Sequence, residues 1–394
     1  MNYINRIIEK KLNDYLKIFP VTALTGPRQS GKTTLILQTL KDKYKYVTFD
    51  NPITVDFFYS DPKEFMLQHS ERVIFDEVQK VPEIFSYIKM EVDKDRENYG
   101  KYILTGSSQF SLLKQVSESL AGRIGLLSLL PFQFRELPNK QRKDQIIHGS
   151  YPELVVREYK NSSEWFSSYI NTYIEKDVRT LHNIGNLRDF QQLIRLLATR
   201  CSQELNMSSL SREIGISVNT IKNWISVLEA SYIIFLLPPY HRNLGKRIVK
   251  RPKMYFYDTG LVCYLTGIEN DEILNKGPLG GSVFENYIAA ETKKSLLHMD
   301  RADQLYFFRN NAGLEADLII ESSNKQSLTY LEIKNNSTPK YKMTENLRII
   351  MGLEKEPSKR KGYLVYKGID EGKFSDSIEY INYRNFFDRI IGKN

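Results

Sequence analysis

The sequence predicts an α/β protein of three parts, and three observations along the 394-residue chain support this division. Short apolar runs alternate with helical stretches up to about residue 140, which is typical of a parallel sheet covered on both faces. From about Tyr151 to Tyr240 apolar residues recur at helical spacing, and after about Tyr255 strands and helices alternate again. We therefore expect domains at residues 1–148, 149–254 and 255–394.

The composition is that of a globular protein, with 41% hydrophobic and 26% charged residues. The sequence shows neither an apolar run of membrane-spanning length nor a signal peptide. Cys201 and Cys263 have no partner spacing, which fits a reducing cytosol, so we expect a cytoplasmic protein without a membrane contact. The net charge of +9 favours anionic partners such as nucleotide or nucleic acid, although a lysine-rich surface would give the same value.

The first domain contains four short apolar runs that we expect to be strands, separated by helical stretches. They are Val21–Leu24, Tyr46–Asp50, Arg72–Glu77 and Lys101–Gly106.

The loop after the first strand fits the pattern G-x-x-x-x-G-K-[ST] at every fixed position, and a helix is expected from Thr33 onward. A strand–loop–helix transition directs backbone N–H groups and the positive end of the helix dipole at one point, which suits a polyphosphate. Lys32 would reach the β- and γ-phosphates, and the Thr33 hydroxyl would bind Mg²⁺. The alternative is a glycine-containing turn before an ordinary helix. We expect nucleotide contacts from Gly26, Pro27, Arg28, Gln29, Ser30, Gly31, Lys32, Thr33 and Thr34.

Two acids end the third expected strand. There Asp76 would hold Mg²⁺ through water, and Glu77 would polarise the water that attacks the γ-phosphate. The alternative is a strand that ends in two solvated acids. The pattern predicts an ATP-hydrolysing site rather than one that only binds phosphate.

Three further residues are candidates for catalysis. Ser107 and Ser108 follow the fourth strand, where a small polar side chain can sense the γ-phosphate; a plain turn is the alternative. Arg123 would neutralise charge in the transition state from a neighbouring subunit of a homo-oligomer, or is an ordinary surface arginine. No Asn-Lys-x-Asp signature for guanine is present, so the sequence favours ATP over GTP.

Five segments carry a resemblance that spans nearly the whole chain: Leu104–Ser108, Leu120–Arg123, Leu130–Glu136, Gly149–Glu153 and Pro252–Leu261. They resemble a large prokaryotic family of AAA-type P-loop ATPases whose C-terminal domain, of unknown function, is similar to restriction endonucleases. In the fourth segment the family more often has two glycines, where this chain has Gly149 and Ser150. The resemblance implies ATP binding and leaves the physiological role open.

The middle domain contains a pattern for a helix-turn-helix. A short helix from Met207 leads to Gly215 in a turn, and Ser217 would cap a second helix that ends near Glu229. The buried face would be Val218, Ile221, Ile225 and Leu228. The outward face would be Asn219, Thr220, Lys222, Asn223 and Ser226.

The basic stretch that follows lies where a winged helix has its wing, and it could contact DNA phosphates. Such modules also serve as lids or protein contacts, so DNA is one of two alternatives here. The basic stretch consists of Arg242, Lys246, Arg247, Lys250, Arg251 and Lys253. The candidate DNA contacts are Lys222, Lys246, Arg247, Lys250 and Arg251.

The C-terminal part resembles the PD-(D/E)xK core, with Asp317, Glu332 and Lys334 as the matching residues. Glu332 and Lys334 share one face of a strand, and a hairpin would bring Asp317 beside them. Two carboxylates that converge on Mg²⁺, with a lysine that polarises water, form a phosphodiesterase site, and Glu285 could add a ligand. The alternative is a scaffold that holds DNA or protein without cutting.

The sequence thus predicts an ATP-binding protein that hydrolyses Mg-ATP and couples it to binding or processing of nucleic acid. The alternative is a nucleotide-gated module that binds a protein partner, with the C-terminal domain as a scaffold.

Overall fold

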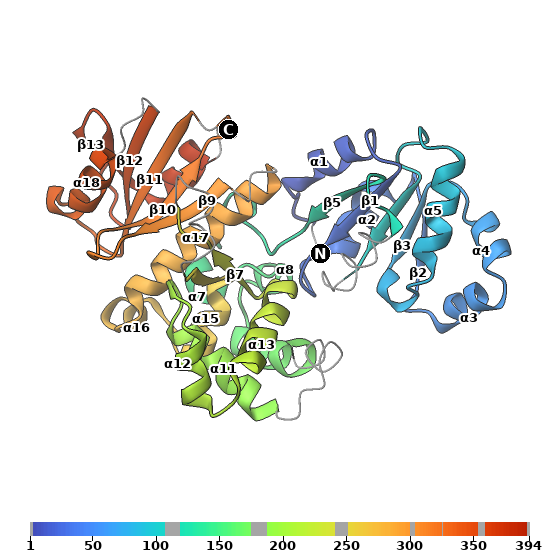
Figure 1. Ribbon diagram of the computed structural model, residues 1–394, viewed down its shortest axis with the longest axis horizontal. Helices are drawn as coiled ribbons and strands as arrows, with labels where there is room; N and C mark the ends of the chain where they lie inside the picture. The colour runs from blue at the N-terminus through green and yellow to red at the C-terminus, as the bar shows by residue number, and fades with distance from the viewer. Residues whose placement is uncertain are drawn as a thin grey trace.

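The computed structural model describes residues 3–106, 119–174, 187–240, 251–299, 304–324, 326–353 and 359–391. The chain forms three lobes. The N-terminal lobe and the C-terminal lobe lie at opposite ends, and the helical middle lies below the junction between them (Figure 1). Within the described residues, no helix is long and apolar enough to cross a membrane.

The N-terminal lobe is built on a parallel five-stranded sheet in the order β2-β3-β4-β1-β5. Its strands are β1 (Val21–Thr25), β2 (Lys45–Thr48), β3 (Val73–Asp76), β4 (Tyr102–Thr105) and β5 (Ile124–Ser128). Its helices are α1 (Ile8–Tyr15), α2 (Lys32–Leu40), α3 (Pro52–Ser60), α4 (Pro62–Gln68) and α5 (Ile84–Lys94), with the 3₁₀ turn η1 (Val78–Lys80) after β3. The four expected strands are therefore confirmed to within one or two residues.

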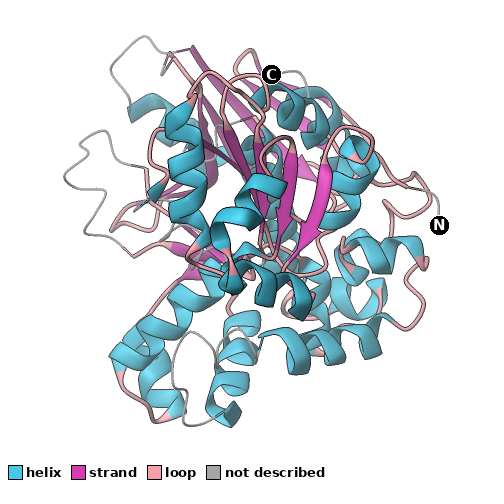
Figure 2. Cartoon of the chain, turned by 90° about the vertical axis from the view of Figure 1, so that its right-hand side faces the viewer, coloured by secondary structure: helices cyan, strands magenta, loops and turns pink. Residues whose placement is uncertain are grey.

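The central strands β1, β3 and β4 are buried at every position because helices cover both faces of this sheet (Figure 2). Strand residues on one face of the sheet, such as Phe75 and Leu104, pack with Phe58 and Phe65 of α3 and α4. The alternate residues, such as Ile74, point to the opposite face and pack with α1 and α2. The carboxyl ends of β1, β3 and β4 consequently meet at one edge.

The middle lobe is mainly helical. Its helices are α7 (Gln145–His148), α8 (Pro152–Val156), α9 (Ser162–Tyr169), η3 (Ile170–Ile174), α11 (Leu187–Thr199), α12 (Met207–Ile214), α13 (Val218–Ala230), α15 (Thr259–Thr266) and α16 (Asp271–Lys276). A small antiparallel sheet in the order β6-β8-β7 joins them, with β6 (Gln203–Glu204), β7 (Ile234–Leu237) and β8 (Lys253–Phe256).

The α12–α13 pair has the expected caps. Gly215 adopts the left-handed conformation at φ 82° and ends α12, and the Ser217 hydroxyl accepts from the Thr220 N–H at 3.0 Å. Ile221, Ile225 and Leu228 are buried as predicted, but Val218 is 43% exposed. The prediction for Val218 was wrong: Val218 is the first residue of α13, and the buried face instead includes Trp224, which packs edge-to-face on Phe190 of α11.

The C-terminal lobe is a six-stranded mixed sheet in the order β13-β14-β12-β11-β10-β9. Its strands are β9 (Leu305–Arg309), β10 (Glu315–Glu321), β11 (Ser327–Lys334), β12 (Lys359–Tyr366), β13 (Gly372–Ser375) and β14 (Ile378–Asn382). Strand β10 is antiparallel to β9 and β11, whereas β11, β12 and β14 are mutually parallel. The helices are α17 (Gly280–His298), α18 (Glu345–Leu353) and α19 (Tyr383–Asn385), with the short turns η5 (Tyr341–Thr344) and η6 (Phe386–Ile391).

A buried ion pair connects the start of the chain to the segment that leaves the first sheet. Arg6 Nε lies 3.2 Å from Glu136 Oε1, and both side chains are almost fully buried. Glu136, in the turn η2 (Phe134–Glu136), also accepts from the backbone N–H groups of Ile7 and Gln133, at 2.7 and 2.9 Å. Burial alone would raise the pKa of Glu136, but Arg6 and His298 hold this pKa below its ordinary value.

The same segment is bonded to helix α17, which is buried along most of its length. The Phe134 N–H donates to Glu291 at 2.6 Å, and the Lys294 ammonium donates to the Phe132 carbonyl at 2.9 Å. Glu291 and Lys294 also form an ion pair at 2.5 Å. We call this set of contacts among Arg6, residues 130–136 and α17 the interdomain joint.

Replacing Glu136 with Gln should destabilise the protein by about 3–5 kcal/mol, because it leaves Arg6 buried without its counter-charge. The measurement is the urea or thermal unfolding midpoint. Since the folded pKa of Glu136 is depressed, its stabilisation is present above the unfolded carboxyl pKa and is lost as the pH falls through the folded pKa. The difference in unfolding midpoint between Glu136→Gln and the wild-type protein should therefore become smaller at acidic pH.

The matched control is Glu158→Gln, which breaks the exposed ion pair with Lys140 and should leave the midpoint unchanged. Equal midpoints for Glu136→Gln and wild type at neutral pH would contradict the role given to the joint.

Candidate functional site

The loop between β1 and α2 has the backbone geometry of a phosphate cradle. Gly26, Gln29 and Gly31 all have positive φ, at 144°, 60° and 91°. A Cβ on Gly26 would lie 2.1 Å from the Leu129 carbonyl oxygen, so only glycine fits. Gly31 is the N-cap of α2, and the first N–H groups of that helix therefore face the loop.

Lys32 is folded back into this loop. Its ammonium donates to the carbonyl oxygens of Gly26 and Pro27, at 3.0 and 2.9 Å, and the side chain is buried. The cation thus lies at the centre of the cradle, where an anion bound on the loop N–H groups would meet it.

Asp76 at the end of β3 gathers hydroxyl groups from three elements. Oδ2 accepts from Thr33 at 3.3 Å and from Tyr46 at 2.5 Å, and Oδ1 accepts from Thr105 at the end of β4. The structure brings together Thr33 and Asp76, the two residues proposed for a metal. Their hydroxyl and carboxylate oxygens are ligands that Mg²⁺ accepts.

Glu77 follows in the left-handed conformation, at φ 57°, which turns it out of the strand direction. The Gln79 side-chain amide donates to its carboxylate. Burial raises the pKa of Glu77 above its ordinary value, and Asp76 adds to this shift while Gln79 and Lys32 oppose it. A carboxylate with a raised pKa beside a phosphate loop is better suited to accept a proton from water.

A cavity of about 420 Å³ lies on the other side of the loop. It runs from the exposed Thr34 at the start of α2 to the N-terminal segment and to α8. Its lining is mostly apolar, with Tyr3, Ile4, Phe132, Pro152 and Val156, while Gln29, Gln38 and Glu153 supply polar groups.

Two side chains that sequence reasoning missed support the loop from behind. Arg6 donates to the carbonyl oxygens of Ser30 and Leu130, at 3.0 and 2.7 Å. The Tyr232 hydroxyl, after α13, lies 2.7 Å from Thr25 Oγ1 and 2.9 Å from Ser128 Oγ. Both contacts come from distant parts of the chain, so no local pattern could have indicated them.

Of the remaining ATPase candidates, Arg123 is not brought to the loop. Arg123 precedes β5, and the pairing of Val21 with Ile124 places it at the opposite edge of the parallel sheet. Its guanidinium donates to both carboxylate oxygens of Asp93, at 2.8 and 3.1 Å. A contribution from a neighbouring subunit therefore stays a prediction. Ser107 and Ser108 lie outside the described residues.

The basic residues of the middle domain divide into three groups. Lys222 is exposed on α13, and Arg251 is exposed just before β8. Arg242, Lys246, Arg247 and Lys250 lie outside the described residues. Lys253 corrects the expectation of an exposed basic stretch, because it is buried and paired with Glu285 and Glu315, at 2.9 and 2.5 Å.

The four residues proposed for a nuclease site lie together. Leu318 pairs with Leu331, so Asp317 and Glu332 are opposite each other on β10 and β11. Asp317 Oδ2 accepts from the Ile333 N–H at 2.7 Å, and Lys334 Nζ lies 2.5 Å from Glu332. Burial raises the pKa values of Glu285 and Glu332, and the charge of Asp317 raises both further.

Lys253 and Lys334 hold the counter-charges of this cluster. Burial acts against the Lys253 ammonium, but Glu285, Asp317 and Glu315 together raise the pKa of Lys253. Lys334 likewise has a raised pKa, because Asp317 and Glu332 outweigh its burial. Across the described ranges, no group of three or more His, Cys, Asp or Glu side chains has the arrangement of a metal site.

The loop geometry and one family match define the class of the N-terminal lobe. Residues 19–138 match a family described as an AAA domain. Together with the parallel sheet and the Lys32, Thr33 and Asp76 arrangement, this identifies an AAA-type P-loop domain. Residues 139–272 match a domain of unknown function (DUF8612), and residues 280–386 match another (DUF4143).

Two proteins that are similar over most of this chain are described as uncharacterized. The chain is 29% identical over 323 residues to the uncharacterized protein Rv2008c of Mycobacterium tuberculosis. This alignment covers 81% of this chain and 71% of that protein. It is 23% identical over 359 residues to the uncharacterized protein MJ1544 of Methanocaldococcus jannaschii, covering 82% and 76%. Among solved structures it is similar to the Walker-type ATPase PABY2304 of Pyrococcus abyssi, with a TM-score of 0.48, 17% identity and coverage of 67% and 96%.

Proposed function

We propose that the N-terminal domain binds Mg-ATP on the 26–34 loop and hydrolyses it. The observation that carries this proposal is the convergence of Thr33, Asp76 and Glu77 beside the buried Lys32 ammonium. Mg²⁺, when bound, neutralises phosphate charge, and Thr33 and Asp76 are the residues that would hold it.

The chain's own groups then divide the work. The N–H groups of the loop and of the first turn of α2 bind the phosphates, and Lys32 exchanges its two carbonyl contacts for phosphate oxygens. The Glu77 carboxylate orients a water molecule and accepts its proton. The apolar cavity beside Thr34 takes the base, with Gln38 and Glu153 as polar groups that could read its edge.

Lys32→Ala should abolish binding of a fluorescent ATP analogue, because the loop loses its cation. Glu77→Gln should keep that affinity and lower the hydrolysis rate by about 10²- to 10⁴-fold, because the water loses its base. The measurements are fluorescence anisotropy for binding and phosphate release for turnover.

The matched control is Glu83→Gln, which removes an exposed acid of the same domain that bonds Tyr59. It should hydrolyse ATP as wild type does. Wild-type turnover in Glu77→Gln, or wild-type binding in Lys32→Ala, would contradict the proposed site.

We propose DNA as the partner of the middle domain, since the α12–α13 pair is followed by β7 and β8. The support is the cap geometry of Gly215 and Ser217 and the outward face of α13, which presents Asn219, Lys222, Asn223 and Ser226 to solvent. The chain order α11, β6, α12, α13, β7 and β8 supports a winged helix, in which the second helix of the α12–α13 pair can enter the major groove.

Lys222→Ala should weaken binding of a labelled duplex and lower the slope of log affinity against log salt by about 0.9, the value for one lost phosphate contact. Lys276→Ala, an exposed lysine of α16, should change neither quantity. If wild-type protein fails to bind duplex DNA at low salt, the middle domain is instead a protein-binding module gated by nucleotide.

We also propose that the C-terminal lobe is a restriction-endonuclease-like core. The succession α17, β9, β10, β11, α18 and β12 supports it, with the antiparallel β10 carrying Asp317 and β11 carrying Glu332 and Lys334. Such a core needs a metal ion to cut DNA, and Glu285, one of the proposed ligands, is already paired with the Lys253 ammonium.

A further inference from the structure

A lysine of the middle domain penetrates the carboxylate cluster of the C-terminal domain. Lys253 lies on β8, in the small sheet next to β6 and β7, and only 3% of its side chain is exposed. Its ammonium contacts Glu285 of α17 and Glu315 of β10, the latter at 2.5 Å. The Tyr255 hydroxyl, also on β8, donates to the same Glu285 oxygen at 2.8 Å.

The cluster behind Lys253 is not fully paired. It contains the carboxylates of Glu285, Glu315, Asp317 and Glu332, whereas the basic groups in contact with it are Lys253, Lys334 and, 3.8 Å from Glu315, Arg309. Glu332 is about 95% buried, and its Oε2 atom has no hydrogen-bond partner among the described residues. A buried carboxylate oxygen without a donor is costly, so the cluster has capacity for one more cation.

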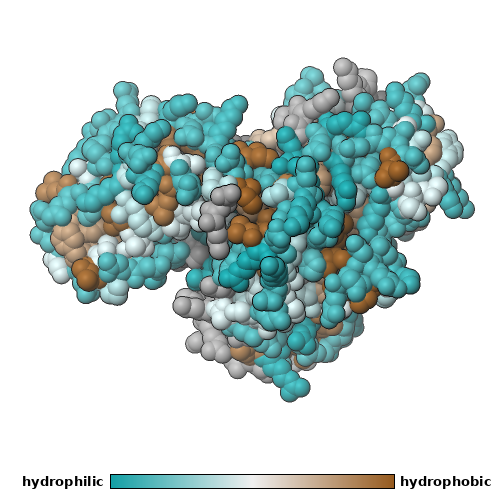
Figure 3. Space-filling model, turned by 180° about the vertical axis from the view of Figure 1, so that it is seen from behind, coloured by the Kyte–Doolittle hydropathy of each residue, from teal (hydrophilic) through white to brown (hydrophobic). Residues whose placement is uncertain are grey.

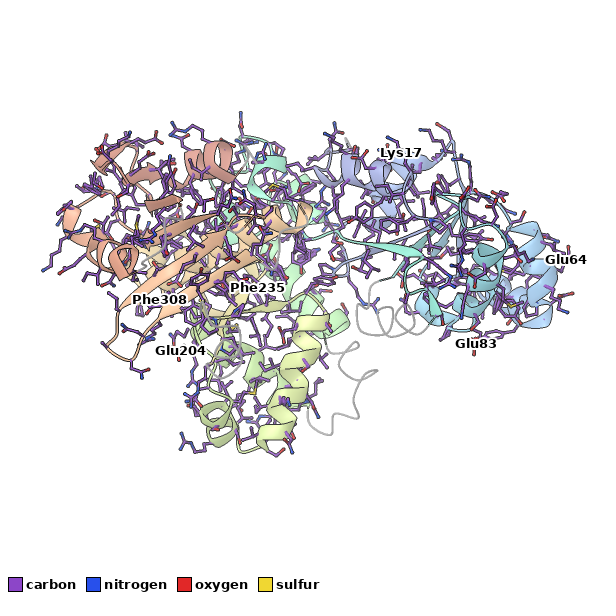
Figure 4. The ribbon with its side chains drawn as sticks, turned by 45° about the horizontal axis from the view of Figure 1, so that its top comes forward. Lys17, Glu64, Glu83, Glu204, Phe235 and Phe308 are labelled. Carbon is purple, nitrogen blue, oxygen red and sulfur yellow. The ribbon has the colours of Figure 1, made fainter. Side chains whose placement is uncertain are left out.

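Solvent reaches the Lys253 side of the cluster. A cavity of about 750 Å³ opens between β6 and the β9–β10 hairpin, and Lys253, Glu285 and Glu315 are part of its wall. Arg309 at its rim is paired with Glu204 at 3.4 Å, and Figure 4 labels Glu204 and Phe308 on the two sides of this junction. The side chains of Glu285 and Glu315 are 17% and 25% exposed, against 3% for Lys253, so an ion from solvent would reach these carboxylates with the Lys253 ammonium already bound to both.

We propose that Lys253 is a built-in cation that closes the C-terminal carboxylate cluster to divalent metal, so that the C-terminal domain holds a latent metal site controlled by the middle domain. The ammonium already contacts Glu285 and Glu315, so a divalent metal on the same carboxylates would lie next to a buried positive charge that repels it. The proposal does not depend on ATP hydrolysis at the 26–34 loop, because it concerns only β8, α17, β10 and β11.

The test is Mn²⁺ binding followed by electron paramagnetic resonance, in nucleotide-free protein that carries Thr33→Ala to remove the metal ligand of the loop. The background protein should bind no Mn²⁺ below about 1 mM. Lys253→Met should bind one Mn²⁺ per chain at least about tenfold more tightly, because the buried carboxylates lose their counter-charge. Adding Glu285→Gln to that variant should abolish the binding.

Lys253→Gln keeps a hydrogen-bond donor of similar volume and serves where Lys253→Met does not fold. Lys276→Met, which breaks an exposed ion pair with Glu272, should bind no more Mn²⁺ than the background. A folded Lys253 variant that binds Mn²⁺ no more tightly overturns the proposal. If neither variant folds, the Mn²⁺ titration of the Thr33→Ala protein decides. Tight Mn²⁺ binding by that protein, if Glu285→Gln abolishes it, would show that Lys253 does not close the site.

Discussion

The buried ion pair between Arg6 and Glu136 is the interaction on which the arrangement of the lobes depends. Arg6 reaches the carbonyl oxygen of Ser30 inside the phosphate loop, and Glu136 accepts from the backbone on both sides of the pair. A buried charge is tolerated only where its partners are complete, which fixes the geometry of everything bonded to it. The first residues of the chain and the segment after β5 are thereby held beneath the loop.

The same segment is attached to α17 through Glu291 and Lys294, so the ATPase-like lobe and the C-terminal lobe share one set of polar contacts. Tyr232 adds a second connection, from the end of α13 to the end of β1. Helices α3 and α4, which carry the exposed side chains of Ile53 and Leu67, lie at the outer end of the N-terminal lobe, away from these connections (Figure 1). Figure 3 shows scattered hydrophobic residues on the surface of this lobe as well as on the other two. The 26–34 loop is thus bonded through Arg6 to the segment that α17 contacts, and Tyr232 of the middle lobe contacts the strand that precedes the loop.

The local features of this fold were accessible from sequence, whereas the long-range contacts were not. The loop, its strand and its helix follow from spacing and glycine positions. Strand alternation and a hairpin allowed Asp317 to lie near Glu332, as the resemblance to the PD-(D/E)xK core implied, and the register of β10 and β11 places them opposite each other. Arg6, Tyr232 and Lys253 act across more than a hundred residues or between domains, so neither periodicity nor motif indicated their partners. Lys253 is the clearest example of a position that the sequence did not predict. Its charge placed it in an expected exposed wing, whereas three acidic neighbours stabilise it in a buried position.

The most direct test of the account is a crystal structure of the Glu77→Gln protein with Mg-ATP. We expect the phosphates to lie on the N–H groups of residues 26–34 and Mg²⁺ to lie beside Thr33 and Asp76. The Lys32 ammonium should have moved from the Gly26 and Pro27 carbonyl oxygens to the phosphates. The base should occupy the cavity beside Thr34. ATP bound elsewhere, or a loop that keeps its Lys32 contacts in the presence of saturating Mg-ATP, would contradict it.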